Sequence, residues 1–80
     1  MINELISKVT DIVQKLLDRP DWPITTEMDL ISNGLSSVNM ILLVVELEEL
    51  FDIVFEDYEL FFESFSTVQK IAELITRKVE

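Results

Sequence analysis

Two adjacent serines, Ser36 and Ser37, are the side chains of this 80-residue chain best placed to do chemistry. They follow the turn signal Asn33-Gly34 and stand just before a long apolar run, Met40 to Val45. If Ser36 caps a helix here, Ser37 is its first residue, and its hydroxyl lies at the positive end of the helix dipole. Free backbone N–H groups at such an end favour an anion, especially a phosphate. Because most serines before a helix are only caps, position alone leaves both roles open.

The chain contains no histidine and no cysteine. The commonest general base, a thiolate nucleophile, a disulfide framework and the usual zinc ligands are therefore missing. Carboxylates such as Glu48 and Glu49 remain for acid–base chemistry, but we expect them on the outer flank of a helix, where raised pKa values do not arise. The composition favours a protein that is not an enzyme and holds no metal.

The charges are segregated along the chain, with a net charge of −10. Between Arg19 and Lys70 there is no basic residue, whereas acidic residues recur throughout that interval. Such a negative field repels nucleic acid and anionic lipid and attracts basic protein surfaces. The alternative is that a net charge away from zero serves solubility alone. We expect protein partners with basic patches.

Length and hydropathy indicate one small domain spanning residues 1–80, with 49% hydrophobic residues. Such a chain buries only about 60% of its extended-chain surface. No basic region precedes an apolar segment at the N-terminus, and the longest apolar run is far short of a membrane span. We therefore expect a soluble cytoplasmic monomer.

Apolar residues at three- and four-residue steps predict an all-α fold, a small four-helix bundle with three longer helices and one short one. The predicted helices cover residues 2–18, 37–51, 56–62 and 67–78, with a long loop over 19–35. A strand at 53–59 is rejected, because no partner strand is visible.

Local signals predict where these helices begin and end. Asn3 is the expected N-cap of the first helix, and Pro20 stops it. Ser66 and Gln69 form the expected capping box of the last helix. Trp22 is one of the apolar residues expected to pin the long loop to the core.

The helix predicted over residues 37–51 has more apolar surface than one core requires. Its expected core stripe consists of Met40, Leu43, Val44, Leu47, Leu50 and Phe51. A second flank is formed by Val38, Ile41, Leu42 and Val45, bordered by Glu48 and Glu49. A small bundle cannot easily bury a helix on all sides, so this flank is a predicted docking face. The alternative is a helix buried more deeply than a small bundle suggests.

The stretch from Gly34 to Ile53 resembles the acyl carrier proteins and the related peptidyl carrier domains. Their pattern runs Gly-x-Asp-Ser-Leu, then a helix ending in Leu-Glu-Glu-x-Phe-x-Ile. Here the matching residues, spaced with no gap, are Gly34, Ser37, Leu47, Glu48, Glu49, Phe51 and Ile53. The start of the family's last helix resembles Phe65, Thr67, Val68 and Ile71, so the resemblance covers essentially the whole chain.

The resemblance implies a non-catalytic carrier with 4′-phosphopantetheine attached to Ser37, and Ser36 as the minor alternative. Such a carrier holds an acyl, aminoacyl or polyketide intermediate as a thioester. It presents this cargo to partner enzymes after a phosphopantetheinyl transferase has modified it. The second helix would be the partner-recognition element. Cargo would shelter between the second and third helices, where Phe61 and Phe62 lie, although both are more readily interpreted as core aromatics.

Three departures from the family pattern matter. Ser36 stands in place of the usual aspartate, and Val38 in place of the leucine. Asn39 and Leu42 occupy positions that are often acidic. The docking face is thus less charged than in typical fatty-acid carriers, which suggests a dedicated partner in polyketide, nonribosomal peptide or other secondary metabolism. The competing hypothesis is an acidic helical interaction module without a prosthetic group.

Overall fold

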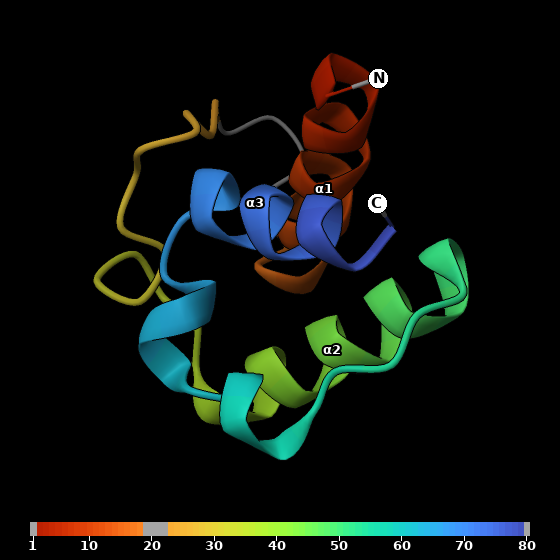
Figure 1. The fold of residues 1–80 in the computed structure, drawn as a ribbon. Helices are drawn as coiled ribbons and strands as arrows, with labels where there is room; N and C mark the ends of the chain where they lie inside the picture. The colour runs from red at the N-terminus through yellow and green to blue at the C-terminus, as the bar shows by residue number, and fades with distance from the viewer. Residues whose placement is uncertain (1, 19–22, 80) are drawn as a thin grey trace.

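The computed structural model describes residues 2–18 and 23–79 and contains three α-helices. These are α1 (Ile2–Leu16), α2 (Ser37–Phe51) and α3 (Val68–Val79). Two short 3-10 helices, η1 (Asp57–Glu59) and η2 (Phe62–Phe65), lie between α2 and α3. α1 packs against both other α-helices, and α2 runs obliquely from the lower centre to the right-hand side of the view in Figure 1. The described ranges contain no strand, so the predicted all-α fold is confirmed.

α1 is shorter than predicted at its C-terminal end. It stops at Leu16, and Asp18 takes a left-handed backbone conformation with φ of 56°. Asn3 lies inside α1, so its predicted role as N-cap is wrong. Pro20 and Trp22 lie outside the described residues.

The short helix predicted over residues 56–62 is replaced by η1 and η2. The chain leaves the helical region at Leu60, whose φ and ψ are −88° and 51°. The physical reason is that Phe55 and Phe65 are both buried and meet edge to face, with ring centroids 5.5 Å apart. A straight helix of ten residues would separate them by about 15 Å, so the chain between them must loop back.

α3 begins one residue later than predicted, and Ser66 does not cap it. Thr67 Oγ1 accepts the Lys70 N–H at 3.0 Å instead. Ser66 has helical backbone angles (φ −75°, ψ −23°), because it closes η2 with its N–H bonded to the Glu63 carbonyl. The Gln69 N–H donates to the Thr26 carbonyl and so ties α3 to the first loop.

The core takes side chains from all three α-helices and from the segments that connect them. Its members are Val9, Val13, Leu30, Leu35, Leu43, Leu47, Phe55, Phe65, Val68, Ile71, Leu74 and Ile75. The prediction that Leu50 faces the core is wrong, because its side chain is exposed. The inward row of α2 runs through Leu43 and Leu47 to the half-buried Phe51, and Leu50 falls at the edge of that row. None of the described helices is long and apolar enough to cross a lipid bilayer.

Candidate functional site

The loop before α2 is fixed by buried leucines at both ends. Leu30 and Leu35 are in the core, and the Leu35 N–H donates to the Leu30 carbonyl at 2.9 Å. The Leu30 N–H donates to the Ser66 carbonyl at 2.7 Å, which joins the loop to the start of α3. Between the leucines, Gly34 has φ of +114°, a region that a residue with a side chain rarely adopts. The start of α2 is therefore held in place from two sides.

Asp29 stabilises the turn that opens this closed loop. Its carboxylate accepts the backbone N–H groups of Ile31 and Ser32, and the Ser32 hydroxyl also donates to it. The hydrogen bond from the Ser32 backbone is the main reason that the pKa of Asp29 lies below its ordinary value. The Asp29 carboxylate therefore serves to stabilise the loop itself.

Ser36 is the N-cap of α2, as predicted, and its hydroxyl is bonded on both sides. Oγ accepts the Asn39 N–H at 3.1 Å and donates to Asn39 Oδ1 at 2.8 Å. Asn39 Oδ1 also accepts the Ser36 N–H at 3.2 Å, which completes a reciprocal capping box. From the sequence, Asn39 was identified only as a position that is often acidic in the resembling family, and its role in capping α2 was not predicted.

Ser37 is the first residue of α2 and is exposed. Within residues 2–18 and 23–79, neither its hydroxyl nor the backbone N–H groups of Ser37 and Val38 have a hydrogen-bond partner. The first turn of α2 carries no acidic side chain. Two free N–H groups at the positive end of a helix, with no competing carboxylate, fit a phosphate ester on the Ser37 hydroxyl.

Four apolar side chains are exposed on the outer face of α2, where the sequence predicted a second apolar flank. Their exposed fractions run from 64% at Val38 and 63% at Ile41 to 47% at Leu42 and 44% at Val45. Their spacing of three and four residues places them on one side of the helix, and Glu49, also exposed, continues it. We call these five residues the α2 outer face.

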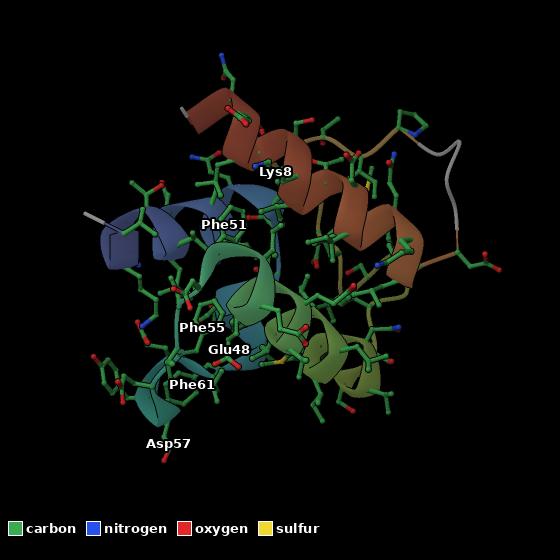
Figure 2. All side chains as sticks on the ribbon, turned by 90° about the vertical axis from the view of Figure 1, so that its right-hand side faces the viewer. Lys8, Glu48, Phe51, Phe55, Asp57 and Phe61 are labelled. Carbon is green, nitrogen blue, oxygen red and sulfur yellow. The ribbon has the colours of Figure 1, made fainter. Side chains whose placement is uncertain are left out.

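Glu48 is engaged differently from Glu49, although the sequence grouped the two. Its Oε2 accepts the Phe55 N–H at 2.9 Å, and Figure 2 shows the two residues side by side. Its carbonyl accepts the N–H of Asp52, which ends α2 in a left-handed conformation. Glu48 therefore closes the helix and holds the next segment, so less of its charge is available to a partner.

Phe61 and Phe62 are both exposed, which corrects their interpretation as core aromatics. Phe61 lines a surface pocket of about 300 Å³ with residues of η2 and α3. The remaining lining residues are Glu63, Ser64, Lys70, Glu73, Leu74 and Arg77. Phe61, but not Phe62, therefore lines this pocket, whose other side chains include both apolar and charged groups.

Glu59 is joined to the end of α3 by a largely buried ion pair. Its Oε1 lies 2.6 Å from Lys78 Nζ, and the two side chains are only 13% and 15% exposed. The Glu56 N–H donates to the same oxygen, and Lys78 Nζ stands 5.5 Å from the Phe55 ring centroid. Burial by itself raises the pKa of Glu59, but these hydrogen bonds and the charges of Lys78 and Arg77 outweigh it and lower the pKa below 4.5.

This ion pair gives a stability that depends on pH. Because the pKa of Glu59 is lower in the folded than in the unfolded state, the contribution is complete above the unfolded pKa and is lost as pH falls through the folded pKa. Carboxyl NMR titration of Glu59 should therefore give a midpoint below the ordinary pKa of a glutamate side chain. Lys78→Met should raise that midpoint, because burial raises the pKa of Glu59 and the hydrogen bond and charge of Lys78 would no longer lower it. The same variant should lower the free energy of unfolding at neutral pH.

Lys70→Met is the matched control for Lys78→Met on the same helix. Lys70 Nζ lies 4.0 Å from Glu63, and both side chains are well exposed. An exposed pair contributes about 0–1 kcal/mol, so this variant should leave the Glu59 midpoint unchanged and stability nearly so. An equal effect of the two variants would contradict the role given to the Glu59–Lys78 pair.

No group of three or more histidine, cysteine or carboxylate side chains that could hold a metal occurs in the described part of the chain. Residues 7–75 match the family described as Phosphopantetheine attachment site. No curated protein gave a match. The matched span includes both serines and all of α2, and members of this family are non-catalytic carriers with covalently bound 4′-phosphopantetheine. By this match, which covers most of its length, the chain belongs to the phosphopantetheine attachment-site family of carrier proteins.

Proposed function

We propose that residues 1–80 form one carrier unit, which holds an acyl, aminoacyl or polyketide intermediate by way of Ser37. The observation that supports this most is the difference between the two serines. The Ser36 hydroxyl is bonded to Asn39 as both donor and acceptor, whereas the Ser37 hydroxyl is exposed and has no partner in the described structure. When bound, 4′-phosphopantetheine supplies a terminal thiol for a thioester, a group that this chain lacks.

The chain's own contribution to the attachment is orientation and charge stabilisation. The Ser37 Oγ would form a bond to the pyrophosphate phosphorus of coenzyme A that carries the pantetheine arm, and the bond from that phosphorus to the adenosine 3′,5′-bisphosphate leaving group would break. The serine proton would pass to the transferase, since this chain has no histidine to accept it. The free N–H groups of Ser37 and Val38 would then stabilise the negative charge of the phosphodiester. A favourable charge at a helix N-terminus contributes about 0.3–1 kcal/mol.

The experiment that tests this function is incubation with coenzyme A and a broad-range phosphopantetheinyl transferase. The intact mass is expected to rise by one phosphopantetheinyl group. No gain in mass with several transferases would contradict the proposed function.

The α2 outer face is the proposed surface for the transferase and for the loading and processing enzymes. Its four exposed apolar side chains lie within a chain segment that has no basic residue between 20 and 69. Partners with a basic patch around an apolar recess would complement it. Glu49 is the acidic group best placed for this, because the Glu48 carboxylate is bonded to the Phe55 N–H.

A dedicated secondary-metabolite pathway is proposed over general fatty-acid synthesis. It is supported by Asn39 and Leu42, which stand where the resembling family is often acidic, and by the exposure of Leu42. We expect fatty-acid synthesis enzymes to use the modified protein more slowly than their own carrier. Equal kcat/KM values for the two carriers would contradict this preference.

A further inference from the structure

We propose that Asn39 is a positioning residue for the modification of Ser37, an inference that rests on the proposed function. Its side chain joins the start of α2 to the end of α1. The Asn39 amide thereby restrains the backbone from which the neighbouring Ser37 hydroxyl projects.

The geometry behind this is a set of hydrogen bonds made by one amide group. Oδ1 accepts both the backbone N–H of Ser36, at 3.2 Å, and its hydroxyl, at 2.8 Å. Nδ2 donates to the carbonyl of Leu16, the last residue of α1, at 3.2 Å. The last carbonyls of a helix have no partner within it, just as the first N–H groups have none. Asn39 therefore satisfies groups at two helix ends at once.

Only a side chain with both an acceptor and a donor can do this. Asp would keep the acceptor for both Ser36 donors but would lose the donor to Leu16. Ala would lose both, leaving Ser36 Oγ with only the backbone N–H of residue 39. The extended conformation of Ser36, with φ of −85° and ψ of 171°, would then be less restrained, and Ser37 follows it directly.

The effect is expected in the rate of transfer rather than in docking. Asn39→Ala changes no charge and none of the five residues of the α2 outer face, so KM should change little in this variant. A misplacement of the reacting atom by about 1 Å can cost about 100-fold in rate. Asn39→Ala would leave the Ser37 hydroxyl less restrained but would not displace it, so we expect a smaller effect. We expect this variant to lower kcat of modification about tenfold. Asn39→Asp should recover most of this kcat, because it keeps the acceptor for Ser36.

Lys15→Met is the matched control, since it breaks another contact between the same two helices. Lys15 Nζ lies 2.5 Å from Glu46 Oε1, and neither residue is part of the capping box that Ser36 and Asn39 form. This variant should leave kcat of modification unchanged. All variants are compared at a temperature where circular dichroism shows each of them folded. The proposal is overturned if Asn39→Ala is modified like the wild type, if Lys15→Met slows equally, or if Asn39→Asp is as slow as Asn39→Ala.

A second measurement needs no transferase and separates this proposal from the proposed function. The N–H groups of Asn39 and Met40 are bonded to the hydroxyl and carbonyl of Ser36. Their hydrogen exchange in the unmodified protein should be about tenfold faster in Asn39→Ala and unchanged in Lys15→Met. If the wild type gained no mass with any transferase, the proposed function would fail. Unchanged exchange in Asn39→Ala would overturn the role of Asn39 whether or not the wild type is modified.

Discussion

Ser37→Ala is expected to abolish the gain of one phosphopantetheinyl group, whereas Ser36→Ala is expected to keep it at a lower rate. Ser37 offers the exposed hydroxyl at the first position of α2. Ser36 offers a hydroxyl that is already bonded to Asn39 in both directions. Loss of an N-cap costs about 1 kcal/mol, which frays the first turn without removing the acceptor of the phosphoryl group. Intact mass over a time course measures both effects.

The stability of Ser37→Ala matters for interpreting a lost modification. Its hydroxyl has no bond within residues 2–18 and 23–79, so removing it should change the free energy of unfolding by no more than about 0.5 kcal/mol. Thermal unfolding followed by circular dichroism checks this. Ser32→Ala is the matched serine control, because Ser32 bonds to Asp29 in the preceding loop and should be dispensable for modification.

Two outcomes would contradict the assignment of Ser37. One is a full gain of mass in Ser37→Ala, with the label found on Ser36 by fragmentation of the peptide. The other is complete loss of modification in a folded Ser36→Ala variant. Either result would make Ser36, now interpreted as a cap, the attachment residue.

The bounds of α2 could be predicted from the sequence because local signals mark its start and the helical pattern continues unbroken to its last residue. Gly34 supplies the turn conformation, and Ser36 caps the helix. Residues 37–51 contain neither glycine nor proline, so nothing interrupts the helix before Phe51. The start of the last helix shows that such signals do not always identify the capping residue. Ser66 and Thr67 are both capping residues by type, and the hydrogen bonds of Ser66 to Glu63 and Leu30 decide between them.

The contacts that shape the site could not be predicted, because they join residues far apart in the chain. Asn39 and Leu16 are separated by 23 positions, and their bond depends on how α1 and α2 pack. The Glu59–Lys78 pair likewise depends on the loop that brings η1 to the end of α3. Periodicity identifies which residues can face outward, but it does not reveal that Glu48 turns to Phe55 and Glu49 to solvent.

Phe65→Ala is expected to destabilise the protein more than any other substitution considered. Phe65 is fully buried and meets the Phe55 ring edge to face, with an interplanar angle of 77°. Removing a buried phenylalanine side chain costs about 3–5 kcal/mol, because the transfer energy of the ring is lost and a cavity remains. A chain of this length has a total stability of about 4–12 kcal/mol. The variant should therefore lose a large part of its stability, and at the lower end of this range it is partly unfolded at 25 °C.

Phe61→Ala is the control, because it is the same substitution four residues earlier at a site with 63% of the side chain exposed. It should change stability by no more than about 0.5 kcal/mol. Urea unfolding followed at 222 nm should give a much lower midpoint for Phe65→Ala and a nearly unchanged one for Phe61→Ala, with similar slopes. In thermal unfolding, a loss of 3 kcal/mol corresponds to a fall of about 12–24 °C. Equal shifts in the two variants would show that the Phe55–Phe65 contact does not anchor the segment between α2 and α3.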